Sequence, residues 1–243
     1  MKILQLNIWS GRLEKQITEL LDREKADVLC LQEVISVPGG NSFFFLDMEE
    51  AQKILGYEYS YLSPSNSFNY MKRKASWGNC ILIKVSFEYK EQVYTFTGPN
   101  DDFDFLENDK YNSGRVLQHV SIKTNEGLLH VLNHHGHHKH EHKNGDEETR
   151  RQCNLIADYV KDLEGPVVLC GDFNLVPDSP SIEQINHVLV NHVKERGIVT
   201  TRTPLTHKTE ACDYIFTSSD IEVKTFQVLD DIVSDHKALT IEF

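Results

Sequence analysis

The sequence predicts an α/β fold in which helices cover mixed β-sheets. Short apolar or alternating segments, which are typical of strands, recur along all 243 residues. The chain opens in the order strand, helix, strand, and this order is typical of α/β folds. Hairpin-like and crossover connections both occur, so we expect sheets that contain parallel and antiparallel pairs.

Residues 3–62 are predicted to contain three strands and two helices. Residues 3–8 alternate and are rich in β-formers, and Leu13, Ile17, Leu20 and Leu21 have helical spacing. The predicted order is a strand over residues 3–8, a helix over 13–24, a strand over 27–31, a helix over 49–55 and a strand over 57–62. Pro38-Gly39-Gly40 interrupts the chain between them.

From residue 80 onward the chain is predicted to be mostly strands, with one long helix. That helix is expected over residues 147–163, and a second helix is expected to start at Asp178-Ser179-Pro180, with a cap followed by proline. Strands are expected over residues 80–85, 93–96, 116–122, 128–133, 167–170, 213–217, 221–228 and 238–243. Two segments are expected to be loops. Residues 98–112 are rich in acidic and turn-forming residues, and residues 134–146 are rich in histidine. Without repeats or a Pro/Ser-rich linker, residues 1–243 are predicted to form a single domain.

The composition is typical of a globular protein, and the net charge argues against a protein that coats nucleic acid or an anionic membrane. Hydrophobic residues make up 40 %, enough for a sizeable core, and the formal net charge is −12. Such a surface does not attract polyanions by its average field, although a bound metal can reverse the local field. The five cysteines are expected to be reduced and mostly buried. We find no signal peptide or apolar run of membrane-spanning length, and expect a cytoplasmic monomer.

Polar residues gather where predicted strands end. They are Asn7, Glu33, His134, His135, Asp172, Asn174, Asp213, Asp235 and His236. Strand ends of an α/β fold can bring such side chains into one cleft. Carboxylates and amides without cysteine suit a hard cation, Mg²⁺ or Mn²⁺, and histidines add acid–base or phosphate-stabilising groups. Each residue alone is weak evidence, because an Asp after Gly is more often a turn residue.

Seven sequence contexts are recognisable, and six of them contain the polar residues named above. The contexts are Leu4-Gln5-Leu6-Asn7-Ile8-Trp9, Leu31-Gln32-Glu33, Trp77-Gly78-Asn79-Cys80-Ile81-Leu82, Asn133-His134-His135-Gly136, Gly171-Asp172-Phe173-Asn174, Cys212-Asp213-Tyr214-Ile215-Phe216 and Ser234-Asp235-His236. In this order they resemble the endonuclease/exonuclease/phosphatase superfamily, whose members include nucleases and phosphatases. The resemblance covers almost the whole chain. It implies two packed mixed β-sheets flanked by helices, a four-layer α/β sandwich with the site at one edge.

The resemblance also implies an activity and roles for its residues. The activity is divalent-metal-dependent hydrolysis of a phosphodiester or phosphomonoester, with water attacking phosphorus in line. Glu33 would be the main metal ligand, with Asn7 and Asp235 nearby. Asp172 would orient or deprotonate the water, and Asn174 would hold the water or a phosphate oxygen. His236 would contact the phosphate, Asp213 would fix its ring, and His135 would contact phosphate or help the leaving group.

Several alternatives stay open at this point. His134 is the competing choice for His135, and Asn79 and Arg115 could reach a phosphate. Trp9 stands where some related nucleases have aspartate, which puts a two-metal site in doubt. The histidines of residues 134–142 could bind a transition metal or form an exposed polar loop beside the site. The substrate is a phosphoester, possibly a nucleic acid, so a nuclease acting on DNA or RNA is one alternative and an inactive binding module is another.

Overall fold

Two β-sheets pack face to face in the computed structural model, which describes residues 1–39, 41–42, 45–46, 53–70, 72–84, 89–98, 100–101, 103, 113–125, 127–139 and 142–243. Within these residues, sheet A contains β1 (Lys2–Asn7), β2 (Val28–Ser36), β3 (Asn41–Ser42), β4 (Phe45–Leu46), β5 (Tyr59–Tyr70), β6 (Arg73–Ile83), β13 (Thr225–Val228) and β14 (Leu239–Glu242). Sheet B contains β7 (Tyr89–Thr97), β8 (Arg115–Thr124), β9 (Gly127–His135), β10 (Val167–Asp172), β11 (Val190–Asn191) and β12 (Asp213–Thr217).

Each sheet has a parallel pair near its centre and antiparallel strands around it. In sheet A the central parallel pair is β1 with β2, and the short strand β4 also runs parallel to β2. In sheet B the parallel pair is β9 with β10. The antiparallel partners include β14 beside β1 and β12 beside β10. The predicted mixture of parallel and antiparallel pairs is therefore confirmed.

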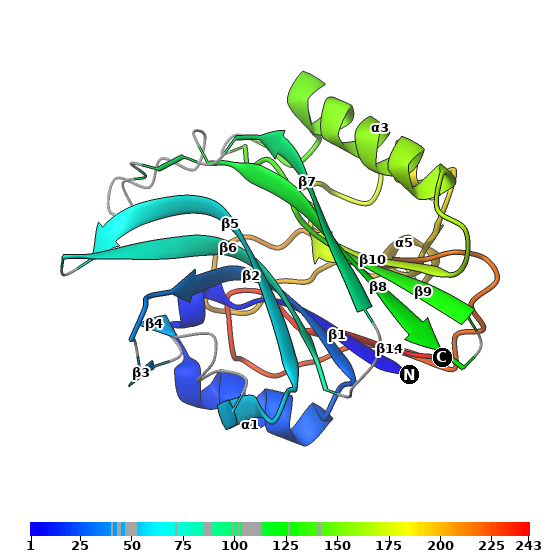
Figure 1. Cartoon of the computed structure of the whole chain (residues 1–243). Coiled ribbons are helices and arrows are strands. Elements are labelled where there is room, and N and C mark those ends of the chain that lie inside the picture. The colour runs from blue at the N-terminus through cyan, green and yellow to red at the C-terminus, as the bar shows by residue number, and fades with distance from the viewer. Residues whose placement is uncertain are drawn as a thin grey trace.

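Helices cover the two outer faces, which gives four layers. Figure 1 shows α1 (Glu14–Glu24) below sheet A and α3 (Glu147–Lys161) above sheet B. Ile17, Leu20 and Leu21 of α1 pack on the outer side chains of β1 and β2. The remaining helical elements among the described residues are η1 (Trp9–Gly11), α4 (Glu183–Asn186), α5 (His192–Glu195) and residues 53–55. The predicted sandwich of two mixed sheets flanked by helices is confirmed.

Local chemistry explains where α3 begins and which face it buries. Asp146 caps the helix by accepting a hydrogen bond of 2.9 Å from the Thr149 backbone N–H, and the Thr149 hydroxyl accepts one from the Asp146 N–H. Cys153, Ile156 and Val160 lie on one face at spacings of three and four residues, and they are buried against sheet B. Burying each large apolar side chain stabilises the fold by about 1.5–3 kcal/mol.

Several boundaries differ from the predicted ones. Strand β5 continues to Tyr70 and β6 begins at Arg73, because the two strands pair along their full length. A bulge between Pro64 and Asn66 accommodates the proline, so a polar segment that resembles a turn in sequence forms strand instead. Helix α4 begins at Glu183 rather than near Pro180, and β13 is shorter than predicted. Residues 49–52 and most of the predicted loop 98–112 lie outside the described residues.

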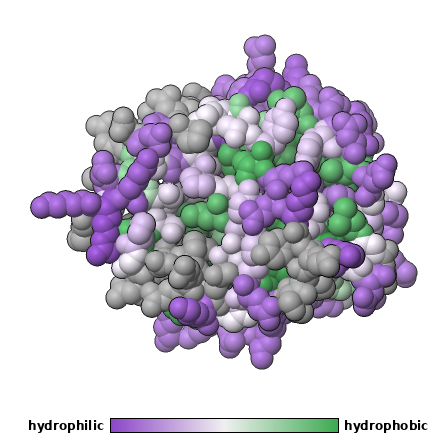
Figure 2. Space-filling model, viewed as in Figure 1, coloured by the Kyte–Doolittle hydropathy of each residue, from purple (hydrophilic) through white to green (hydrophobic). Residues whose placement is uncertain are grey.

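Other predictions about the surface and the cysteines are consistent with the structure. All five cysteines are free and buried. In the part of the chain that the structure describes, no helix is long and apolar enough to cross a membrane. Figure 2 shows that the visible face is mostly hydrophilic, with hydrophobic side chains in small separate areas. A single domain over residues 1–243 stays a prediction.

A buried histidine connects sheet B to α3. His119 of β8 is 2 % exposed, and its Nδ1 lies 2.8 Å from the Tyr159 hydroxyl of α3. Its Nε2 lies 2.9 Å from Nδ1 of His130. Burial, together with the charges of His130 and Lys90, lowers the pKa of His119 to about 4.

We therefore expect His119 to make folding less favourable in acid. The pKa is lower in the folded chain than the unperturbed value of about 6.5, so below that value the unfolded chain takes up a proton that the folded chain does not. Stability is complete above about pH 6.5 and declines as the pH falls toward 4. At pH 5 the loss attributable to one such histidine is about 2 kcal/mol.

The measurement is the free energy of unfolding in urea at pH 7.5 and pH 5. His119→Gln should show a smaller decrease between the two values than the native chain does. His187→Gln is the control, because that side chain is 65 % exposed. Equal pH dependence in the native chain and in His119→Gln would contradict the prediction.

Candidate active site

The polar strand ends converge at one edge of the sandwich. Asn7 is the last residue of β1, and Asp172 is the last residue of β10. His135 ends β9 and pairs in register with Asp172, because β9 and β10 run in parallel. Asp213 begins β12 and lies opposite Asp172 in the antiparallel pair. The topology thus brings together residues more than 200 positions apart in the sequence.

Glu33 reaches the site because β2 is irregular at this point. The register of β2 against β6 shifts between Leu31 and Val34, and Glu33 has φ of +59°. A bulge of this kind turns a side chain away from the regular alternation and is frequent beside active sites. Trp9, Ser10 and Asn174 also have positive φ. Of these residues, Trp9, Glu33 and Asn174 line one pocket, and such clustering of strained residues is the pattern expected of a functional site.

Two glycines allow the chain segments around Asp172 to approach closely. A Cβ at Gly171 would lie 2.0 Å from the carbonyl oxygen of His134. A Cβ at Gly136 would lie 2.4 Å from the carbonyl oxygen of Phe173. The close approach lets the Gly136 N–H donate a hydrogen bond of 2.8 Å to the Asp172 carbonyl. Larger residues here would separate His135 from Asp172.

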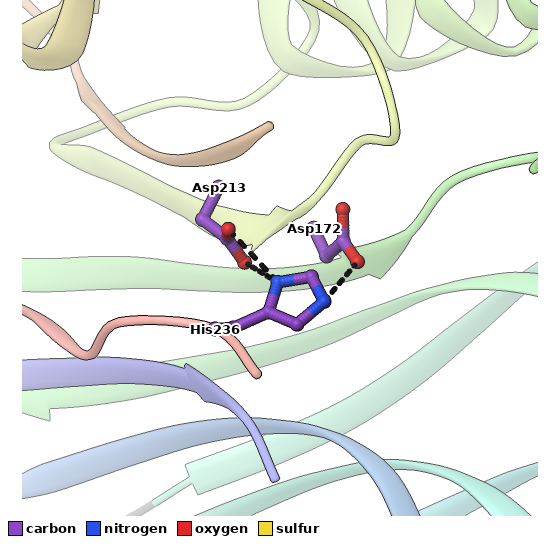
Figure 3. A group of neighbouring side chains, drawn as sticks. All are labelled: Asp172, Asp213 and His236. Atoms are coloured by element: carbon purple, nitrogen blue, oxygen red, sulfur yellow. Dashed lines mark hydrogen bonds and ion pairs between the residues drawn. The ribbon is translucent and has the colours of Figure 1, made fainter. Parts of the chain in front are cut away.

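Asp213, His236 and Asp172 form a linear arrangement at the centre of the site (Figure 3). His236 Nδ1 lies 2.9 Å from both carboxylate oxygens of Asp213. Its Nε2 lies 3.6 Å from Asp172 Oδ2. Asp213 is fully buried and also accepts a hydrogen bond from the hydroxyl of Thr201. The ring of His236 is therefore held in one orientation, with Nε2 facing Asp172.

The carboxylates and the neighbouring cationic side chains shift the pKa values of His236 and Asp172 in opposite directions. Burial lowers the pKa of His236, but the charges of Asp213 and Asp172 outweigh burial and the net shift is upward. Burial raises the pKa of Asp172, but His236 and Arg202 outweigh it and hold the pKa of that carboxyl well below its usual range. At neutral pH the site thus holds a carboxylate at Asp172 beside an imidazole that is readily protonated.

A second group of oxygen ligands lies beside this arrangement. The Asn7 Nδ2 atom is 3.3 Å from Glu33 Oε1 and 3.1 Å from Asp172 Oδ2. Glu33 and Asp235 both line the same pocket as Asp172. The Asn7 Oδ1 atom accepts a hydrogen bond of 3.0 Å from the Trp9 backbone N–H, so Asn7 presents its amide nitrogen to the two carboxylates. Carboxylate oxygens are the ligands that Mg²⁺ or Mn²⁺ prefers, and those of Glu33 and Asp235 therefore fit a hard divalent cation.

By distance alone, Asp172, Asp213 and His236 could also hold a metal. We favour the other set, because Nδ1 of His236 is already bonded to Asp213 and Nε2 faces Asp172. An imidazole in this position is suited to proton transfer and to contacts with phosphate. Among the described histidines of residues 134–142, no three form a group that could hold a metal. His140 lies outside the described residues.

The structure separates the adjacent histidines His134 and His135. His135 lines the pocket, and its Nε2 lies 3.7 Å from Asp172 Oδ2. His134 points to the other face of β9, where its Nδ1 lies 3.1 Å from the Val116 carbonyl and its ring packs edge-on against Phe173. Burial lowers the pKa of His134 to about 4 and lowers that of His135 well below its usual value.

We expect His135→Gln to reduce kcat/KM by about 100-fold or more, because it removes a neutral imidazole beside Asp172. His134→Gln should change kcat/KM by less than about threefold and should instead lower the free energy of unfolding. Both quantities are measured on both variants with one substrate. A larger loss of activity in His134→Gln would show that the two histidines have been assigned to the wrong roles.

Basic residues from two connecting segments also reach the site, and the sequence did not reveal their role. Arg202 is 5 % exposed, and its guanidinium contacts Nε2 of His236. Lys143 is 6 % exposed, and its Nζ donates a hydrogen bond of 2.7 Å to Asn174 Oδ1. Burial lowers the pKa of Lys143 to about 8. The Nζ of Lys208 lies 3.4 Å from His138 Nε2.

Arg202, Lys208 and His138 line a pocket that is partly open to solvent. Both tryptophans of the chain, Trp9 and Trp77, line it. Arg115 lines it too, where its Nε donates to the Gly136 carbonyl at 2.9 Å. Asn79 instead lies between the sheets, and its Nδ2 lies 3.4 Å from the Asn133 carbonyl oxygen.

A chain of buried amides supports the site from the space between the sheets. Gln5 Nε2 donates to Gln32 Oε1 at 2.9 Å, and Gln32 Nε2 donates to Asn133 Oδ1 at 2.7 Å. Asn133 Nδ2 continues to Gln118 Oε1 at 3.2 Å. Gln5 Nε2 also lies 3.3 Å from Asp213 Oδ1. Such a hydrogen-bonded network fixes the register of the two sheets and the position of Asp213.

Two mixed sheets, with a histidine and carboxylates at their common edge, define the class of hydrolytic phosphoesterases and nucleases. The chain belongs to the Endonuclease/Exonuclease/phosphatase family, whose sequence model matches residues 4–236. The match includes every proposed site residue, from Asn7 to His236. A comparison with curated protein sequences finds no match.

Solved structures with the same fold share little sequence with this chain. An endonuclease/exonuclease/phosphatase from Beutenbergia cavernae DSM 12333 is 18 % identical, with a TM-score of 0.73 over 99 % of this chain and 70 % of that one. The mannosyl-6-phosphatase Bt3783 of Bacteroides thetaiotaomicron VPI-5482 is 16 % identical, with a TM-score of 0.69 over 100 % and 98 %. The human Nocturnin catalytic domain, solved with bound sulfate, is 17 % identical, with a TM-score of 0.70 over 99 % and 92 %.

Proposed function

We propose that the chain is a divalent-metal-dependent hydrolase that cleaves compact phosphoesters, with water attacking phosphorus in line. The observation that carries this proposal is the linear group Asp213–His236–Asp172 beside the carboxylate of Glu33 and the amide of Asn7. A proton-transfer group and a hard-cation site side by side are what metal-assisted hydrolysis needs. The mannosyl-6-phosphatase with the same fold acts on a compact phosphate ester, as its name states.

Each proposed role follows from the position of the side chain. Asn7, Glu33 and Asp235 would hold Mg²⁺ or Mn²⁺, which would neutralise charge on the phosphoryl oxygens when bound. Asp172 would orient the attacking water and accept its proton, because its carboxylate faces the pocket. His236 would donate a hydrogen bond from Nε2 to a phosphoryl oxygen, while Asp213 keeps the ring in place.

Asn174 and His135 complete the set. The Asn174 backbone N–H donates to Asp172 Oδ1 at 3.0 Å, and Lys143 fixes the amide oxygen of its side chain. The Asn174 Nδ2 atom lies 3.4 Å from the Gly136 carbonyl oxygen, and its second N–H would contact the water or a phosphate oxygen. His135 would contact the phosphate or the leaving group from the end of β9. No residue needs to become covalently attached to the substrate.

The test is a turnover screen with Mg²⁺ or Mn²⁺, with and without excess EDTA. Substrates are aryl phosphates, sphingomyelin, phosphoinositides, RNA, and single- and double-stranded DNA. We expect cation-dependent turnover of a compact ester, with KM nearly independent of salt because the chain has a net charge of −12. Tight duplex binding with a steep salt dependence, together with poor turnover of every small ester, would favour a nuclease instead. A monomer and a cytoplasmic location stay predictions.

A further inference from the structure

Part of the pocket wall is positively charged, although the chain as a whole carries a net charge of −12. Arg202 and Lys208 come from the segment between α5 and β12 and line the pocket together with His138. Lys143 lies behind this wall, bonded to Asn174. The proposed metal site uses the carboxylates of the pocket and leaves Arg202 and Lys208 without an assigned role.

Arg202 is placed at the reacting centre. Its backbone forms a β-bridge with His236, and its Nη1 contacts Nε2 of that ring. The side chain is 5 % exposed, yet its buried Nε has no hydrogen-bond partner, and no ion pair of Arg202 is found among the described residues. Buried guanidinium groups are normally paired with carboxylate or phosphate oxygens. An anionic ligand would supply the missing acceptor.

We propose that Arg202 and Lys208 form a binding subsite for a terminal phosphate, so that the chain prefers phosphomonoesters to phosphodiesters. The inference rests on the proposed function and names its substrate class. A phosphate oxygen beside His236 would accept hydrogen bonds from the Arg202 guanidinium and replace the ring nitrogen as its partner. Lys208, which is half-buried, would add a second positive charge from the pocket wall.

The contact between Arg202 and His236 indicates that the second negative charge of the substrate lies on the reacting phosphate itself. His236 is the proposed contact of that phosphate, so Arg202 cannot be reserved for a distant group of the substrate. A phosphomonoester carries a charge of about −1.5 to −2 at pH 7 and has three terminal oxygens. A diester carries one charge and has two, and its second alcohol would have to fit beside the guanidinium. The cationic wall therefore complements the monoester.

The experiment compares 4-nitrophenyl phosphate with methyl 4-nitrophenyl phosphate, which share a leaving group. Arg202→Gln should lower kcat/KM for the monoester by about 10- to 100-fold and for the diester by less than about threefold. Lys208→Gln should act in the same direction with a smaller loss, mainly in KM. Arg202→Lys should recover part of the monoester activity. Lys15→Gln, an exposed charge on α1, is the control and should change neither.

Equal losses for both esters in Arg202→Gln and Lys208→Gln would overturn the inference while leaving the proposed function intact. If Arg202→Gln fails to fold, Lys208→Gln decides, because its side chain is half-buried on a loop. If the native chain hydrolyses no phosphoester, the proposed function fails. The subsite is then tested separately, by the binding of phosphate. Inorganic phosphate, but not dimethyl phosphate, should then raise Tm of the native chain and not of Lys208→Gln. An equal Tm increase in both proteins would overturn the subsite.

Discussion

Glu33→Gln should lower kcat/KM by about 1000-fold or more, with little change in the free energy of unfolding. The substitution preserves the shape of the side chain and its contact with the Ser10 hydroxyl, but removes the negative charge that a hard cation requires. Because Glu33 is presented on a strained bulge of β2, no neighbouring carboxylate can take its place without moving the backbone. Excess EDTA should reduce the activity of the native chain to the same level.

Activity and Mn²⁺ binding are measured together on this variant. Binding should weaken in parallel with turnover, and Glu19→Gln on the exposed face of α1 should match the native chain in both. Unchanged turnover of the native chain in EDTA would remove the metal from the proposed function. Normal Mn²⁺ binding by an inactive Glu33→Gln variant would show that residues other than Glu33 bind the cation.

Asp172→Asn should lower kcat by about 1000-fold or more, and His236→Ala should have an effect of similar size. An amide at position 172 can still occupy the space between Asn7 and His236, but it cannot accept the proton of the attacking water. His236→Ala removes the hydrogen bond to the phosphoryl oxygen. General acid–base groups in such positions contribute about 100- to 10,000-fold.

Asp213→Asn provides the internal comparison. Asp213 supports the ring of His236 without facing the pocket, so its loss should cost about 10- to 100-fold in kcat. The three variants are measured at saturating substrate and metal, and circular dichroism confirms that each is folded. A larger loss for Asp213→Asn than for His236→Ala would show that the roles of the two residues are wrongly assigned.

Local sequence patterns determined the elements that carry the site. The alternation over residues 3–8, the apolar segment before Asp172 and the spacing in α1 and α3 each predict an element whose boundaries the structure confirms to within about two residues. These patterns are readable because a helix or strand with one buried face repeats its apolar residues at a fixed period. The strand-end polar residues followed from the same patterns, and the structure brings them to one edge.

Tertiary pairing decided what the local patterns could not express. Strand β5 continues through a segment rich in serine, proline and asparagine, because β6 supplies hydrogen-bond partners along its whole length. The amides of Gln5, Gln32, Asn133 and Gln118 look like ordinary polar residues in sequence and meet only when the two sheets pack. The orientation of each of the two adjacent histidines likewise depends on which face of β9 points toward sheet A.

The cationic wall of the pocket is the clearest case. Arg202, Lys208 and Lys143 stand singly in polar loops, where a basic residue is most often solvated, and no periodic pattern marks any of them. Only the packing of these loops over the ends of β9, β10 and β12 buries Arg202 against His236 and Lys143 against Asn174. The sequence by itself therefore determined the family and the four layers, and it singled out the acidic and histidine residues that the structure brings to one edge. The tertiary structure decided the charge of the pocket, because that charge arises from contacts between segments far apart in the chain.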